Sequence, residues 1–264
     1  MIKKILNDLT PPLIKKTYKR WFKTTTYRPE WVQLNNGIKM YMDRETQLFH
    51  AFNDGLDPFI YDHLEKELNK QELIVYDLGA HFGYHTLAFA KEKNVKKVYA
   101  FEPNPDNRKR LVMNTAKNPD LKEKITIIDK AISKEKGTSV FLAFKDVEQG
   151  VSSASMLQTE KSKAKRNDDL AREITVDIDT LDNLISDGLL LPPDIIKMDI
   201  EGAEYDALEG GLQMLVKNKP VLMIEVHTIL NMYKLAELFK KLNYHYELIH
   251  VEKDGRVFIK AYYN

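Results

Sequence analysis

The stretch that decides the fold is Leu73-Ile74-Val75-Tyr76-Asp77-Leu78-Gly79-Ala80-His81-Phe82-Gly83. Its apolar run of strand-forming residues ends near an acid and then breaks into a turn that contains two glycines. Residues 84–93 follow with the spacing of a helix. A strand, a glycine turn and a helix in this order open a doubly wound α/β domain, whose ligands bind at the carboxyl edge of the sheet. We therefore predict a ligand site at this turn.

A second acid has the position expected for binding a nucleoside. Residues 95–101 form the next predicted strand, and Glu102 follows it, nineteen residues after Gly83 (102 − 83). An acid at this distance can accept hydrogen bonds from both hydroxyls of a ribose. The turn lacks the middle glycine of G-x-G-x-x-G, and the carboxylate of Asp77 would repel the pyrophosphate of a dinucleotide. S-Adenosylmethionine has a ribose, an ammonium and a sulfonium but no phosphate, so its charges fit better.

Further ionisable residues gather at the ends of later predicted strands. Residues 194–200 form a nearly continuous apolar strand, as a strand buried on both faces should, and Asp199 lies at its end. The next strand, residues 221–226, carries Glu225 and precedes His227. Unpaired charge is costly at buried strand ends, so such a cluster indicates a cation, a substrate or a network. The remaining acids are Glu201 and Glu204, at the start of a predicted helix over residues 203–217, and Asp129, in a predicted strand over residues 125–132.

Three motifs together resemble one known family. They are Asp77-x-Gly79-Ala80-x-x-Gly83, Phe101-Glu102-Pro103 and Ile196-Lys197-Met198-Asp199-Ile200-Glu201-Gly202-Ala203-Glu204, and they occur in this order. The chain resembles the FkbM family of S-adenosylmethionine-dependent methyltransferases over residues 73–227. The resemblance implies O-methylation, often of sugar or polyketide hydroxyls. It also implies a Rossmann-like class I methyltransferase sheet of about seven strands, mostly parallel, with a closing antiparallel pair, which residues 244–251 and 256–263 supply.

We predict a catalytic set of His227, Asp199 and Glu201. His227 or Asp199 would take the proton of an acceptor hydroxyl, while neighbouring glutamates orient the acceptor or the base. In a variant of this mechanism, Mg²⁺ at Asp199 lowers the pKa of the hydroxyl. Alternatively, Asp199 starts the following helix and His227 is an ordinary satisfied histidine. The other predicted site residues are Asp77, Gly79, Ala80, Gly83, Glu102, Asp129 and Asp199 for the cofactor, and Glu204, Glu225 and Ser153 for the acceptor.

Ser153 lies in a long polar segment between residues 145 and 172 that has no periodicity. Loops of this length are uncommon unless they are functional or disordered, so residues 150–156 are a predicted lid or acceptor-binding loop, or else an exposed excursion. His81 and His85 have the i, i+4 spacing of a metal pair, but no third ligand is evident nearby, which favours a packing or surface role.

Composition sets the bounds of these predictions. The chain has 264 residues, of which 43% are hydrophobic, enough for a full core. It contains no cysteine, which excludes disulfides, thiolate zinc sites and cysteine nucleophiles. No apolar run approaches the roughly 18 residues typical of a membrane span, and the N-terminus lacks the apolar core of a secretory signal. We therefore expect a cytoplasmic protein.

Residues 1–28 are strongly basic, with eight lysines and arginines and one aspartate, giving 8 − 1 = +7 against −6 for the remainder. Apolar residues alternate with the lysines, so this segment either lies on an anionic membrane surface or packs on the main domain. The acidic remainder opposes binding to nucleic acid. We place the protein at the inner face of a membrane as a peripheral enzyme that acts on glycan precursors.

The predicted organisation is an N-terminal part, residues 1–72, followed by an S-adenosylmethionine-binding domain, residues 73–264. The N-terminal part contains a hairpin over residues 32–42, with Asn36-Gly37 at the bend, and a helix over residues 57–68. Asn53-Asp54-Gly55 is either a plain turn or a contact to the methionine part of the cofactor. Two other functions stay open: an NAD enzyme that modifies nucleotide sugars, and a non-catalytic binding protein on the same fold.

Overall fold

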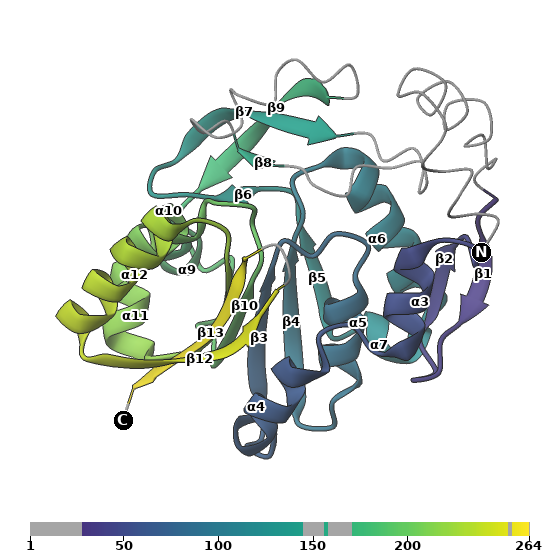
Figure 1. Ribbon diagram of the computed structural model, residues 1–264, viewed down its shortest axis with the longest axis horizontal. Helices are drawn as coiled ribbons and strands as arrows, with labels where there is room; N and C mark the ends of the chain where they lie inside the picture. Colours follow the sequence, from purple (N-terminus) through teal and green to yellow (C-terminus); the bar gives the residue numbers. More distant parts are fainter. Residues whose placement is uncertain (1–27, 145–155, 158–170, 253–254, 264) are drawn as a thin grey trace, which may run out of the picture.

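The computed structural model describes residues 28–144, 156–157, 171–252 and 255–263. Its centre is a seven-stranded sheet with the order β12-β13-β11-β10-β3-β4-β5 (Figure 1). The strands from β11 to β5 are parallel, and β13 and β12 close the sheet as an antiparallel pair, so the predicted sheet is confirmed. The bounds are Leu73–Leu78 for β3, Val95–Phe101 for β4, Ile125–Ile128 for β5, Ile195–Met198 for β10, Val221–Val226 for β11, Tyr244–Val251 for β12 and Val257–Tyr263 for β13.

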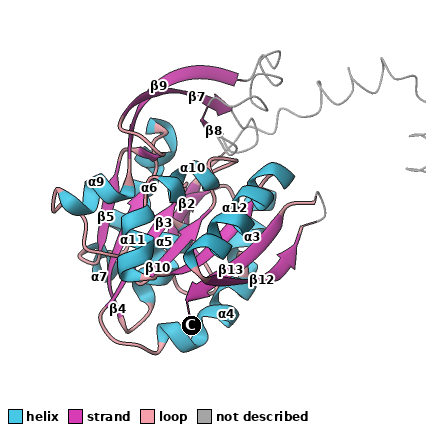
Figure 2. Cartoon of the chain, turned by 90° about the vertical axis from the view of Figure 1, so that its left-hand side faces the viewer, coloured by secondary structure: helices cyan, strands magenta, loops and turns pink. Residues whose placement is uncertain are grey.

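Helices cover both faces of this sheet (Figures 1 and 2). All six residues of β3 are buried, because alternate side chains pack into different clusters. Tyr76 packs with helices on one face and Val75 with helices on the other. The first face carries α9 (Leu181–Ser186), α10 (Glu204–Glu209), α11 (Leu212–Asn218) and α12 (Ile229–Leu242), and the second carries α4 (Pro58–Leu68), α5 (Tyr84–Lys91), α6 (Pro105–Lys117) and α7 (Pro119–Lys122).

The predicted hairpin is present as β1 (Glu30–Gln33) and β2 (Lys39–Met42). It is fixed to α6 through amide side chains: the Tyr41 backbone N–H donates to Asn114 Oδ1 at 2.8 Å, and the Lys39 N–H donates to Asn118 Oδ1 at 3.0 Å. A helix that we did not predict, α3 (Gln47–Asp54), follows and is capped by the Thr46 side chain. This N-terminal part therefore stands beside the glycine turn of β3.

The predicted strand over residues 125–132 is wrong in its extent. It divides at Asp129 and Lys130 into β5, in the main sheet, and β6 (Ala131–Ile132). β6 belongs to a second sheet with the order β6-β9-β7-β8, which contains β7 (Gly137–Phe144), β8 (Met156–Leu157) and β9 (Ala171–Asp179). Figure 1 shows this sheet beyond the carboxyl edge of the central strands.

The predicted helix over residues 203–217 is also wrong, because α10 and α11 are separate helices joined at Gly210 and Gly211. A Cβ atom on Gly210 would lie 2.1 Å from the carbonyl oxygen of Ser133. The break therefore brings the helix backbone against the segment that follows β6. The spacing of apolar residues along the sequence carries no information about a contact between segments so far apart, so it could not predict this break.

Replacing Gly210 by alanine should destabilise the protein by about 1–3 kcal/mol or more, because the added methyl overlaps a backbone atom that cannot rotate away. Urea denaturation followed by circular dichroism measures the change in the free energy of unfolding. An unchanged midpoint would contradict the close packing of Gly210 against Ser133.

Residues 1–27 and 150–155 lie outside the described residues, and with them most of the predicted membrane-binding segment and the predicted acceptor residue Ser153. Within the ranges that the structure describes, no helix is both long and apolar enough to cross a bilayer.

Candidate active site

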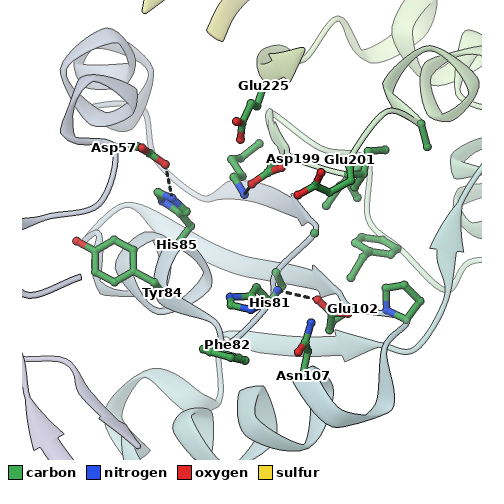
Figure 3. Close-up of a pocket in the computed structure, with 18 of the residues that line it drawn as sticks. Asp57, His81, Phe82, Tyr84, His85, Glu102, Asn107, Asp199, Glu201 and Glu225 are labelled. Atoms are coloured by element: carbon green, nitrogen blue, oxygen red, sulfur yellow. Dashed lines mark hydrogen bonds and ion pairs between the residues drawn. The ribbon is translucent and has the colours of Figure 1, made fainter. Parts of the chain in front are cut away.

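A cavity of about 330 Å³ lies at the carboxyl edge of the central strands (Figure 3). Its walls come from the turn after β3, the ends of β4, β10 and β11, and the N-terminal part of the chain. Six predicted site residues line it, namely Gly79, Ala80, Glu102, Asp199, Glu201 and Glu225. His81 and His85, for which a packing or surface role was favoured, line it as well.

The glycine turn is held against the end of β10. Gly79 has φ +85°, and a Cβ atom there would lie 1.9 Å from the carbonyl oxygen of Asp199. Only glycine fits this position, both for its backbone angle and for its contact. Gly83 also has a positive φ of 88°, but it precedes α5 and lies against Leu111 rather than lining the cavity. The structure therefore gives Gly83 a part in shaping the turn, and its contact with the cofactor stays a prediction.

Glu102 lies at the end of β4, as predicted, and lines the cavity. Its Oε2 accepts a hydrogen bond from the His81 backbone N–H at 2.9 Å, and its Oε1 accepts one from the Asn104 N–H at 2.9 Å. These two bonds fix the carboxylate between the turn of β3 and the start of α6. Burial raises the pKa of Glu102 to about 7, against the lowering effect of these hydrogen bonds.

Asp77, which the sequence predicts as a cofactor contact, is not among the residues that line the cavity. Its side chain is fully buried, and its Oδ2 accepts a hydrogen bond from the Thr86 hydroxyl at 2.5 Å. Its Oδ1 lies 3.6 Å from the Nζ atom of Lys197, which is the residue directly opposite Asp77 on β10. Asp77 is therefore the counter-ion of a buried lysine.

Lys197 is a site residue to which the sequence analysis gave no role. It lines the cavity, is 3% exposed, and its Nζ atom is also 3.8 Å from Asp199 Oδ2. Burial by itself lowers the pKa of Lys197, but Asp77 and Asp199 outweigh it and raise the pKa above its ordinary value. The sequence did hold a signal for this role, which is a lysine inside an otherwise apolar, buried strand. Because lysine is almost never fully buried without a partner, its position indicates a buried ion pair.

His227 lies in the acidic cluster that the sequence predicts. Its Nε2 atom is 3.5 Å from Asp199 Oδ1 and 3.6 Å from Glu201 Oε2, while its Nδ1 atom is 2.8 Å from Glu204 Oε1. Burial alone would lower the pKa of His227, but the hydrogen bond to Glu204 and the charge of Asp199 raise it to about 9. The imidazole is consequently protonated at neutral pH and must lose a proton before it acts as a base.

Glu204, which the sequence predicts as an acceptor-binding residue, is fully buried and is not among the residues that line the cavity. Its carboxylate instead accepts hydrogen bonds from the Gly202 backbone N–H, at 2.7 Å, and from the Asn231 side chain, in addition to holding His227. The geometry matches the other role considered for it, which is orientation of the base.

Glu225 lines the cavity at the end of β11, where Figure 3 shows it above Asp199. It is paired with Arg256 from the start of the last strand. Burial, followed by the charge of Asp199, raises the pKa of Glu225 to about 8. Burial also raises the pKa of Asp199, but Lys197 and His227 lower it below its ordinary value overall. Asp199 is therefore the carboxylate of the two that stays ionised.

The structure places the remaining predicted residues as follows. Asp129, a predicted cofactor contact, is exposed and is not among the residues that line the cavity, whereas its neighbour Lys130 lines it. One ligand atom from each of Asp199, Glu201 and His227 lies within 4.8 Å of the others, which is close enough to hold a metal ion. The Nδ1 atom of His85 is 3.0 Å from the Tyr61 hydroxyl, and its Nε2 atom faces Asp57 at 3.3 Å.

The strand order and the helices on both faces define a doubly wound, Rossmann-like fold with its cavity at the carboxyl edge of the parallel strands. Residues 77–246 match the family model of the methyltransferase FkbM domain. The chain belongs to the FkbM family of methyltransferases, which confirms the resemblance drawn from its motifs and argues against the NAD enzyme.

Two further comparisons describe its relatives. The chain is 24% identical over 190 residues to the hexuronic acid methyltransferase AglP of Haloferax volcanii, covering 70% of this chain and 69% of that protein. The crystal structure of methyltransferase FkbM from Methylobacillus flagellatus is similar in fold, with a TM-score of 0.53 and 19% identity. That match covers 72% of this chain but only 44% of the solved protein, so the chain spans less than half of its length.

Proposed function

We propose that this protein transfers the methyl group of S-adenosylmethionine to a hydroxyl of a sugar or glycan precursor. His227 does not itself line the cavity, but its Nε2 atom lies 3.5 Å from Asp199 Oδ1 and 3.6 Å from Glu201 Oε2, which do. The observation that carries the proposal is that the cavity is lined both by Glu102 after β4 and by the acidic cluster at the ends of β10 and β11. The former is suited to a ribose and the latter to proton removal. A sugar acceptor is supported by the name of the Haloferax volcanii relative.

The charges that line the cavity fit this cofactor. The cavity-lining cations Lys130, Lys197 and Arg256 each lie beside an acidic side chain, that of Asp179, Asp77 and Glu225 respectively. Further carboxylates, those of Asp57, Glu102, Asp199 and Glu201, also line it and favour a positively charged ligand. When bound, S-adenosylmethionine supplies an electrophilic methyl group on a cationic sulfur.

The protein's own part is to hold the acceptor and to remove its proton. We propose that His227 Nε2 accepts the proton of the acceptor hydroxyl. Glu204 holds the other ring nitrogen, Nδ1, while Asp199 and Glu201 flank Nε2. Because the pKa of His227 is about 9, the rate of transfer should rise with pH through the neutral range.

A second version of the proposal uses a divalent cation. The proximity of ligand atoms from Asp199, Glu201 and His227 favours it, and such an ion would lower the pKa of an acceptor hydroxyl. Incubation with labelled S-adenosylmethionine and a panel of sugars and nucleotide sugars, with and without EDTA, tests both versions. Transfer that is unaffected by EDTA would contradict the cation. Absence of transfer together with no affinity for S-adenosylhomocysteine would contradict the proposed function.

The role proposed for Glu102 predicts pH-dependent binding of the cofactor. Only the ionised carboxylate accepts from both ribose hydroxyls, and the pKa of Glu102 is about 7. The affinity for S-adenosylhomocysteine should therefore be constant above this pH and fall about tenfold per pH unit below it. Calorimetric titration from pH 5.5 to about 8.5 measures this. In Glu102→Gln the affinity should be lower and nearly independent of pH; a wild-type slope in that variant would assign the titration to another group.

A further inference from the structure

The cavity has a polar wall that none of the roles above uses. Asp57 and His85 line it, and Figure 3 shows them on the side opposite Glu102 and Asn107, with His81 and Phe82 of the glycine turn between. Asp57 immediately precedes α4, and His85 lies in the first turn of α5. The two residues therefore join the N-terminal part of the chain to the glycine turn.

A chain of hydrogen bonds orients the Asp57 carboxylate. The Tyr61 hydroxyl lies 3.0 Å from His85 Nδ1, and His85 Nε2 lies 3.3 Å from Asp57 Oδ2. The carboxylate of Asp57 can only accept, so in the neutral imidazole the ring proton lies on Nε2 and is donated to Asp57. Nδ1 is then the acceptor of the hydrogen bond that the Tyr61 hydroxyl donates. Since His85 is 6% exposed, this arrangement is fixed within the protein.

The backbone of Asp57 adds an independent observation. Its φ of 47° and ψ of 53° are left-handed, a conformation that costs free energy for any residue with a Cβ atom. Asp57 also occupies the N-cap position of α4, where an aspartate normally accepts from the helix backbone, yet its side chain makes no such bond. A strained residue that gives up a helix cap and faces a cavity is a candidate for a functional role.

We propose that Asp57 binds the ammonium group of the amino-acid end of S-adenosylmethionine, with His85 and Tyr61 as positioning residues. The inference rests on the proposed function and specifies its cofactor site. When Glu102 holds the ribose, the side of the cavity across the glycine turn receives the group attached to the 5′ carbon. The carboxylate there matches an ammonium in charge and in hydrogen bonding.

Two ligands that differ only in this end test the inference. S-Adenosylhomocysteine contains the amino acid, whereas 5′-methylthioadenosine has the same nucleoside and a thioether without it. Isothermal titration calorimetry on the full chain would compare both ligands in the wild type, in Asp57→Asn and in Asp57→Gly. Asparagine and glycine adopt the left-handed conformation most readily, so both variants should keep the fold of this turn. Asp62→Asn, which removes the same charge from an exposed position of α4, is the matched control.

Asp57→Asn and Asp57→Gly should weaken the binding of S-adenosylhomocysteine by about 10- to 100-fold, as expected for a hydrogen bond to a charged group, and leave 5′-methylthioadenosine unaffected. Asp62→Asn should change neither affinity. Equal losses for both ligands, or no loss for either, would overturn the assignment of Asp57. In that case Glu102→Gln still decides the proposed function, because it should weaken both ligands together. A wild-type protein that binds neither ligand would overturn both inferences.

Discussion

Replacing His227 by alanine is expected to lower the rate constant for methyl transfer by about 10²–10⁴-fold, the range that a positioned general base contributes. Affinity for S-adenosylhomocysteine should change little, because His227 contacts Asp199, Glu201 and Glu204 rather than the glycine turn. Single-turnover kinetics with labelled cofactor measure the effect. His245→Ala, an exposed histidine on β12, is the control and should retain full activity.

Glu204 allows the assignment of the base to be checked without removing the ring. Because Glu204 raises the pKa of His227, Glu204→Gln should lower that pKa and move the rising part of the pH–rate profile to lower pH. A change that only disturbs the fold would reduce the rate equally at every pH. Wild-type rates in His227→Ala would show that another group takes the proton.

Replacing Lys197 by methionine is expected to reduce the free energy of unfolding by about 3–5 kcal/mol, because it leaves the buried carboxylate of Asp77 without a counter-ion. Urea denaturation at pH 7 measures this change. The double variant Asp77→Asn with Lys197→Met should recover much of the loss, since the uncompensated charge is gone while the amide can still pair with Thr86.

The control for this prediction is Lys96→Met on the neighbouring strand β4. Lys96 also pairs with an acid, Glu72, at 3.2 Å, but both side chains are mostly exposed. Such a surface pair contributes at most about 1 kcal/mol, so the variant should have nearly wild-type stability. Equal effects of Lys96→Met and Lys197→Met would contradict a buried ion pair beneath the cavity.

The central sheet was predictable because its information is local. A continuous apolar run such as residues 73–78 has to be buried on both faces, and the glycines after it have to make a turn. The closing hairpin of β12 and β13 and the end position of Glu102 follow from spacing in the same way. These features can be predicted without knowing which strands are neighbours in the sheet.

The errors come from contacts between segments distant in the sequence. The sequence pattern around an acid beside a glycine turn does not distinguish an acid that contacts a ligand from one that pairs with a lysine. Asp77 is a counter-ion because the register between β3 and β10 places Lys197 opposite it. The division of the helix at Gly210 depends on Ser133 in the same way. Glu204 has the spacing of a site residue, but its burial behind His227 depends on how α10 and α12 pack together.

The contact between Gly79 and the Asp199 carbonyl joins two loops with different tasks. Because their backbones are in close contact, we expect the loop after β3 and the loop after β10 to move only together. Phe141 of the second sheet and Arg256 before the last strand line other walls of the cavity and take no part in the contact between Gly79 and Asp199. We therefore expect substitutions in those walls to alter which molecules the cavity accepts, and substitutions at Gly79 to disrupt the fold of the loop itself.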